Sequence, residues 1–125
     1  MSEDVAVVGL GIHPFGRHPG ISGLGMAAHA VRAALADAGI GWEQVDFAAG
    51  GSDSAGNADT MVSVLGLTGV PFINVKNGCA TGGSALTTAH AVLSAGSADI
   101  AVVVGFDKHP PGAFNPLPEE WGIGS

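Results

Sequence analysis

The sequence predicts an α/β protein with a parallel sheet, because short apolar runs alternate with segments of helical periodicity. The first run, 5–11 (VAVVGLG), combines apolar and β-branched residues as a strand buried on both faces does. Three further strand-like runs follow it: 45–49, 72–75 and 99–106. The order β-α-β-α-β-α-β favours right-handed crossovers, and ligands of such sheets bind beyond the carboxyl ends of the strands.

Helical periodicity fills the gaps between these runs. From Ser22 onward apolar residues recur at helical spacing, Ser22 is a suitable N-cap, and Gly39 is a suitable helix end. A short helix is expected over 58–65 and a longer, alanine-rich helix over 80–95. Two stretches rich in glycine with proline or serine are predicted loops: 13–20 and 50–57.

The composition indicates a domain that is partly covered by other protein. Charged residues make up 12% of the 125 residues, against a usual value of about 25%, and 21 residues are glycine. A chain of this length exposes much surface and here has few charges to solvate it. We assign 1–106 to one N-terminal α/β domain and 107–125 to the proline-rich start of a loop region.

Net charge and cysteine content exclude several classes of function. The formal net charge is −7 and no lysine or arginine cluster occurs, so neither nucleic acids nor anionic membranes are expected partners. A single cysteine excludes an internal disulfide and suits a reducing compartment, so we expect a cytoplasmic protein. The acidic N-terminus leads into an apolar run too short to span a membrane and unlike a signal peptide.

That cysteine lies in the segment 77–86 (NGCATGGSAL), between a predicted strand and a predicted helix. Cys79 is therefore expected at a helix N-terminus, where unpaired backbone N–H groups and the helix dipole favour a thiolate. A lone cysteine in an apolar chain is often a buried packing residue. Here the flanking glycines and the position between strand and helix favour a nucleophile that a ligand can reach.

A nucleophilic thiol needs a base, and the five histidines differ in how well they are placed. His90 follows Cys79 at a distance of about 16 Å along a helix, which is too far for direct proton transfer. His109 follows the fourth predicted strand and reaches the same sheet edge. It is the candidate to act beside Cys79, although a solvated position next to two prolines also explains it. The others are predicted loop or helix-surface groups: His13, His18 and His29.

No pattern in the sequence predicts a metal or dinucleotide site. Gly9-Leu10-Gly11 resembles the start of a G-x-G-x-x-G fingerprint, but Pro14 replaces the third glycine and no helix follows directly. The histidines are scattered, with no H-x-x-x-H pair, so no metal ligand set is expected. We expect no permanently bound cofactor.

Residues 65–86 (LGLTGVPFINVKNGCATGGSAL) closely resemble thiolases of the sterol carrier protein type. Residues 98–108 (ADIAVVVGFDK) are similar to the fourth strand of that family and the turn after it. Weaker similarities involve its first strand and the loop before its second helix, at 7–11 and 51–54. The resemblance covers most of 5–114, and the block around Cys79 is its most specific part.

The resemblance implies a thiolase-like fold, of which this chain is the first half, and acyl transfer through a cysteine thioester. Cys79 matches the acyl-accepting nucleophile, and Gly78 and His109 are assigned to substrate binding. Coenzyme A is implied as a co-substrate, with a 3-oxoacyl-CoA of lipid or sterol metabolism cleaved or formed. The family forms dimers through the strand that matches 72–75, so a homodimer or hetero-oligomer is expected.

The family's acid/base histidine and second cysteine belong to the later half of its fold. The 125 residues are therefore expected to be a fragment that is catalytically silent by itself. His109 stands where related sequences commonly carry methionine, and Gly78 where they carry asparagine, which bears on substrate choice. Two alternatives stay open: a carbon–carbon lyase of the steroid side-chain aldolase type, and a non-catalytic assembly subunit.

Overall fold

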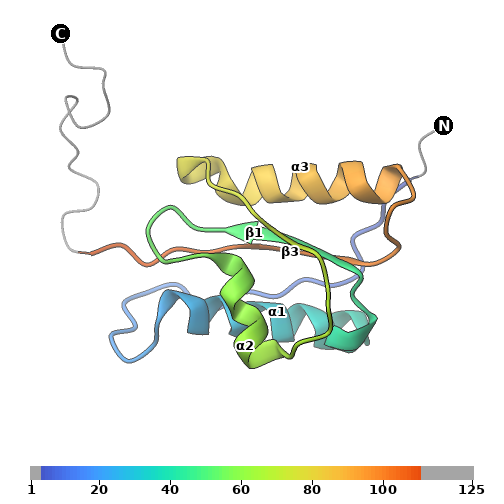
Figure 1. The fold of residues 1–125 in the computed structure, drawn as a ribbon. Helices are drawn as coiled ribbons and strands as arrows, with labels where there is room; N and C mark the ends of the chain where they lie inside the picture. The colour runs from blue at the N-terminus through green and yellow to red at the C-terminus, as the bar shows by residue number, and fades with distance from the viewer. Residues whose placement is uncertain (1–3, 111–125) are drawn as a thin grey trace, which may run out of the picture.

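The structure, a computed structural model, describes residues 4–110 and shows a parallel sheet with helices on both faces. In Figure 1, α3 covers one face of the sheet, while α1 and α2 cover the other. The helices and strands, in chain order, are α1 (Gly23–Ala38), β1 (Phe47–Gly51), α2 (Val62–Leu65), β2 (Phe72–Asn74), α3 (Thr81–Ser94) and β3 (Ala101–Gly105). Three 3₁₀ turns lie between them: η1 (Trp42–Gln44), η2 (Ala58–Met61) and η3 (Gly78–Ala80).

The sheet has the order β2-β1-β3, and both strand pairs are parallel. Ala48 in β1 lies opposite Phe72 in β2 and opposite Val102 in β3, so β1 is the central strand. Every residue of β1 is buried. Its sequence, FAAGG, contains mostly small side chains, which allow the two helix layers to lie close to the sheet.

Local capping signals define the ends of α1, as the sequence predicts. The Ser22 hydroxyl accepts a hydrogen bond from Gly25 N at 3.0 Å and so caps the first turn. Gly39 ends the helix in a left-handed conformation, with φ 73°, and its N–H returns to the carbonyls of Leu35 and Ala36.

Two apolar clusters form the core, one on each face of the sheet. On the α1 and α2 face, Met61 is 1% exposed and Trp42 is 7% exposed, and the indole N–H of Trp42 donates to Gly66 O at 2.9 Å. On the α3 face, Phe47 packs with alanines of the strand and helix. Alternate residues of β1 thus enter opposite clusters, as the two-residue period of a strand requires.

The prediction of a first strand at 5–11 is wrong. Strands β1 and β3 pair directly with each other, and the described residues of the sheet include none from this segment. The side chains of Val7, Val8 and Leu10 are 72%, 68% and 75% exposed. The observed order over residues 4–110 is therefore α-β-α-β-α-β.

Segment 5–11 runs alongside α1 instead of entering the sheet. A Cβ atom on Gly9 would overlap the carbonyl oxygen of Ala34, so the two backbones approach closely only because position 9 is glycine. The N–H of Leu10 donates to the Asp37 carboxylate at 2.9 Å. Backbone contacts therefore hold this segment while its apolar side chains stay in solvent.

The remaining predicted elements exist, with shifted boundaries. The helix expected at 58–65 is split into η2 and α2, and the strand expected at 45–49 begins two residues later. The strand expected at 99–106 is β3, and it differs from β1 in that only Val104 of its residues is buried. An edge strand has neighbours on one side only, which explains this difference. Of the predicted loop region 107–125, residues 111–125 lie outside the described part of the chain.

Candidate active site

Cys79 lies in the 3₁₀ turn η3, between β2 and α3. The sequence predicts that Cys79 lies in the first turn of an α-helix. In the structure Cys79 lies in a 3₁₀ turn instead, and the α-helix α3 begins two residues later, at Thr81. The hydrogen bonds of this turn are donated by Ala80 N to Asn77 O, at 2.9 Å, and by Thr81 N to Gly78 O. The N–H groups of Gly78 and Cys79 precede the first bonded donor, and such groups have no acceptor within the helix.

The side chain of Thr81 holds this turn in place. Thr81 is 5% exposed, and its hydroxyl donates to Gly78 O at 2.8 Å and accepts from Asn77 N at 2.9 Å. The Asn77 amide in turn donates to the Ser84 hydroxyl at 3.0 Å. Residues of α3 therefore fix Asn77 and Gly78, the two residues directly before Cys79.

Glycine contacts bring this turn to the carboxyl edge of the sheet. A Cβ on Gly51, at the end of β1, would overlap the Val75 carbonyl, and a Cβ on Gly105, at the end of β3, would lie 2.9 Å from the Gly82 Cα atom. Larger residues at either position would push the strand away from η3 and α3. The predicted location of Cys79 at this edge is therefore correct.

The thiol of Cys79 is free and exposed. The alternative of a buried packing cysteine is therefore wrong for this structure. Two cavities of about 920 and 750 Å³ lie beside β3, and Cys79 lines neither of them. The described residues thus present the sulfur on an open surface rather than in an enclosed pocket.

Asp107, directly after β3, anchors the loop that follows β1. Its carboxylate accepts hydrogen bonds from Asp53 N at 3.0 Å, Ser54 N at 3.1 Å and the Ser54 hydroxyl at 2.8 Å. Burial raises the pKa of Asp107, but these bonds and one from Lys108 N lower it more, so its pKa lies below the usual value of 3.8. The sequence does not predict these contacts of Asp107 with Asp53 and Ser54, which join residues more than 50 positions apart.

His109 lies beside the same loop. Its Nδ1 atom is 3.4 Å from the Ser54 hydroxyl, and its Nε2 atom is 3.7 Å from the Asp107 carboxylate. These two contacts orient the imidazole toward the loop after β1. A role for His109 beside Cys79 or the substrate stays a prediction.

Within residues 4–110, no group of histidine, cysteine, aspartate and glutamate side chains is arranged to hold a metal ion. None of the helices in this part of the chain is both long and apolar enough to cross a membrane.

The described residues thus form a parallel α/β domain with a cysteine turn at the carboxyl edge of its sheet. The family model described as the N-terminal domain of thiolase matches residues 5–109. The chain therefore belongs to the thiolase family.

Curated relatives agree with this assignment. Sterol carrier protein 2 of Homo sapiens is 38% identical over 117 residues, which covers 88% of this chain and 21% of that protein. Sterol carrier protein 2 of Gallus gallus is 36% identical, covering 91% and 22%. The benzoylsuccinyl-CoA thiolase subunit BbsB of Thauera aromatica is 29% identical, covering 87% and 29%. This chain spans only about a fifth of the length of the sterol carrier protein 2 relatives.

Solved structures support the fold. The 3-oxoacyl-[acyl-carrier-protein] synthase III of Aquifex aeolicus superposes with a TM-score of 0.62 at 21% identity, covering 69% of this chain and 30% of that one. The OleA protein of Xanthomonas campestris, solved with bound lauric acid and lauroyl-CoA, gives 0.60 at 23% identity, covering 67% and 27%. The predicted thiolase-like α/β fold is confirmed by these similarities.

Proposed function

We propose that Cys79 takes up an acyl group as a thioester in a thiolase reaction. In the condensation direction its thiolate displaces CoA from an acyl-CoA, and in the cleavage direction it attacks the 3-oxo carbon of a 3-oxoacyl-CoA and releases acetyl-CoA. The observation that carries this proposal is the exposed sulfur of Cys79 on a turn at the carboxyl edge of the sheet. Membership of the thiolase family supports it, as does the similarity to an enzyme named as a CoA thiolase.

The backbone of η3 is suited to stabilising the charge that develops in this reaction. When a thiolate attacks a thioester, the carbonyl oxygen becomes an oxyanion, which preorganised N–H groups stabilise. The N–H groups of Gly78 and Cys79 precede the bonded donors of the turn, and Thr81 holds their orientation. We assign the Cys79 N–H to the oxyanion and Gly78 to the substrate-binding surface.

The proton transfers of the reaction require groups that we place outside residues 4–110. The resemblance assigns the acid/base histidine and a second cysteine to the later half of the thiolase fold. His109 is proposed to contact substrate rather than to act as the base, because its imidazole is oriented by Ser54 and Asp107. The physiological substrate is proposed to be a lipid or sterol-derived acyl-CoA, as the name of the sterol carrier protein relatives suggests.

We also propose that the protein forms a homodimer or hetero-oligomer through β2. This strand lies at the edge of the sheet, and the Ile73 side chain is 44% exposed. An open strand edge pairs readily with a second strand. Light scattering on the purified protein should give a mass above that of one chain, and a single-chain mass would contradict this proposal. The single cysteine supports a cytoplasmic location.

The test of the reaction is a thiolysis assay on the protein as it is encoded, with acetoacetyl-CoA and longer 3-oxoacyl-CoA substrates. Replacing Cys79→Ala should lower the rate on the order of 10⁴-fold, since a covalent nucleophile is lost. Carbon–carbon cleavage that persists in this variant would instead support a lyase on the same scaffold. Absence of activity in the wild-type protein with all acyl-CoA substrates would support a non-catalytic subunit.

A further inference from the structure

Three polar side chains from two distant segments meet directly after β3. Oδ1 of Asp107 accepts a hydrogen bond from the Ser54 hydroxyl at 2.8 Å. The same hydroxyl oxygen lies 3.4 Å from Nδ1 of His109, at the long end of the hydrogen-bond range. Ser54 therefore links the carboxylate to the imidazole, and we call Asp107, Ser54 and His109 the polar triplet.

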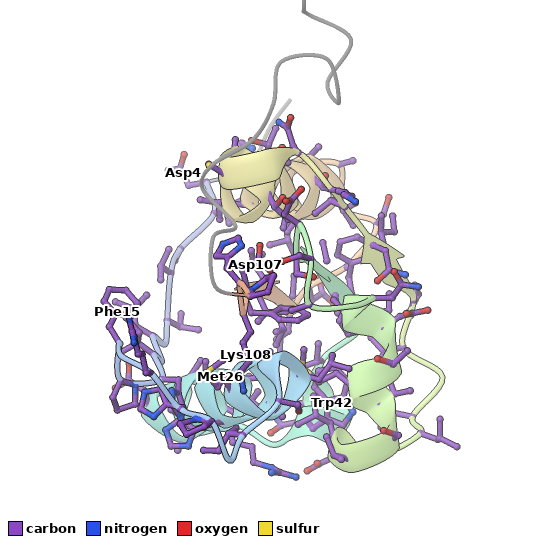
Figure 2. All side chains as sticks on the ribbon, turned by 90° about the vertical axis from the view of Figure 1, so that its left-hand side faces the viewer. Asp4, Phe15, Met26, Trp42, Asp107 and Lys108 are labelled. Atoms are coloured by element: carbon purple, nitrogen blue, oxygen red, sulfur yellow. The ribbon has the colours of Figure 1, made fainter. Side chains whose placement is uncertain are left out.

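The polar triplet borders a cavity of about 920 Å³ at the carboxyl end of β3, and His109 is part of its lining. In Figure 2, Asp107 and Phe15 lie on opposite sides of this space. Ligands of parallel α/β sheets bind beyond this edge, so the imidazole is placed where a ligand would contact it. Basic side chains of the segment 13–18 also line the cavity: His13, Arg17 and His18.

Asp107 fixes the position of Ser54 through the backbone as well. Its Oδ1 atom also accepts from Ser54 N at 3.1 Å, and its Oδ2 atom accepts from Asp53 N at 3.0 Å. Lys108 N donates to Oδ1 at 3.1 Å, so the carboxylate itself is held at the end of β3. The Ser54 hydroxyl therefore has a defined place relative to the imidazole of His109.

The protons of the polar triplet can be assigned from these contacts. Burial raises the pKa of Asp107, but its hydrogen bonds lower it more, to below 3.8, so at neutral pH the carboxylate is ionised and only accepts. The single hydroxyl proton of Ser54 goes to this carboxylate, so toward His109 the oxygen acts as an acceptor. Nδ1 of His109 must then carry the proton. Its Nε2 atom lies 3.7 Å from Oδ2 of Asp107, which is too far for a hydrogen bond to fix a second proton there.

Asp46 shows what a carboxylate with a purely structural role looks like in this fold. It also accepts hydrogen bonds from backbone N–H groups, those of Asp99 and Ile100. It lies directly before β1, whereas Asp107 lies after β3, so the two carboxylates are at opposite ends of the parallel sheet. Within residues 4–110, the hydrogen bonds of Asp46 are all to the backbone, and no side chain is oriented through it.

We propose that Asp107 and Ser54 are positioning residues for His109, which hold its neutral imidazole as the Nδ1–H tautomer in the wall of this cavity. The hydrogen bond at one ring nitrogen decides which tautomer is present and therefore whether Nε2 acts as a donor or as an acceptor. In the assigned tautomer Nε2 accepts hydrogen bonds. The contribution of this arrangement to substrate binding rests on the proposed function, whereas the tautomer does not.

The first test is a long-range ¹H–¹⁵N correlation spectrum of the histidine side chains, recorded on the protein as it is encoded at about pH 8, where imidazoles are neutral. The signals of His109 are those that His109→Gln lacks. The wild-type ring should carry its proton on Nδ1. Ser54→Ala should lower the ratio of Nδ1–H to Nε2–H about fivefold, the effect of one hydrogen bond, and Ser54→Thr, which keeps the hydroxyl, should retain the wild-type ratio.

Two aspartate variants separate positioning from a general effect on the fold. Asp107→Asn should shift the tautomer ratio in the same direction as Ser54→Ala, because an amide no longer binds the hydroxyl proton as an ionised acceptor. Asp46→Asn removes a comparable carboxylate at the other end of the sheet and should leave the ratio unchanged. A wild-type ring protonated on Nε2, or equal ratios in the wild type and Ser54→Ala, would overturn the proposal.

The second test measures thiolysis of a 3-oxoacyl-CoA by the same variants. Ser54→Ala should raise KM about threefold to fivefold with kcat nearly unchanged, since His109 is assigned to substrate contact and not to proton transfer. Asp46→Asn should change neither constant. An unchanged KM in Ser54→Ala would overturn the role of the polar triplet in substrate binding. The tautomer measurement needs no activity, so a wild-type protein without thiolysis would refute the proposed function while the spectrum still decides whether Asp107 and Ser54 position His109.

Discussion

Strand β1 and the N-terminal segment 5–11 lie on opposite sides of β3, and both are rich in apolar residues (Figure 2). Strand β1 pairs with β2 and β3 and is covered by helices on both faces, so all its residues are buried. Segment 5–11 is separated from β3 by a cavity of about 750 Å³ and contacts α1 mainly through its backbone. Apolar composition alone therefore does not define a buried strand, because burial also needs partners on each side.

The largest effect in this comparison is expected in β1. Phe47 is 5% exposed and packs in the cluster beneath α3. Phe47→Ala should lower the free energy of unfolding by about 3–5 kcal/mol through lost burial and a residual cavity. Urea denaturation followed by circular dichroism measures it. A loss below about 1 kcal/mol would mean that the core beneath α3 is not tightly packed.

A smaller effect is expected where segment 5–11 contacts α1. Gly9→Ala places a methyl group against the Ala34 carbonyl and should cost about 1–3 kcal/mol by overpacking. Gly83→Ala is the matched control, because its Cβ meets no atom within 4 Å and alanine favours a helix. The same denaturation experiment compares them. If both variants were equally stable, segment 5–11 would not pack on α1 in solution.

A carboxylate anchors each of the two regions: Asp37 accepts a hydrogen bond from Leu10 N in segment 5–11, and Asp46 acts next to β1. Asp46, directly before β1, accepts hydrogen bonds from Asp99 N and Ile100 N, which lower its pKa below 3.8. A lowered pKa means that this stabilisation is present above about pH 3.8 and is lost as the pH falls through the folded-state value. Asp46→Asn should therefore reduce the acid dependence of stability. Thermal melts between pH 2 and 6 check this, and an unchanged acid slope would contradict it.

The smallest effect is expected for the exposed side chains of segment 5–11. Val8 is 68% exposed, so Val8→Ala should change the free energy of unfolding by about 0.5 kcal/mol or less. The buried Val104 in β3 offers the control, since Val104→Ala should cost clearly more. A cost for Val8→Ala equal to that for Val104→Ala would show that segment 5–11 is a buried strand in solution.

Local signals in the sequence were sufficient to predict most elements. Ser22 and Gly39 define the ends of α1 through contacts within a few residues, so a single sequence carries that information. The position of Cys79 between β2 and α3 is also local, because it follows from a strand-like run, two glycines and a helical run.

Non-local contacts explain what the sequence did not predict. Whether segment 5–11 joins the sheet depends on whether β1 and β3 pair with each other, and periodicity carries no information about that choice. The contacts of Asp107 with the loop at Ser54, and the gathering of histidines around Arg17, join segments distant in sequence.

The most direct test of the proposed function is to trap the acyl group on Cys79. The protein as it is encoded is incubated with acetyl-CoA, quenched in acid and measured by intact-protein mass spectrometry, with Cys79→Ala as the control. The wild-type protein should gain the mass of one acetyl group, which hydroxylamine removes because it cleaves thioesters, and Cys79→Ala should show no such gain. An unmodified wild-type protein, or equal acetylation of the variant, would contradict the assignment of Cys79 as the acyl acceptor.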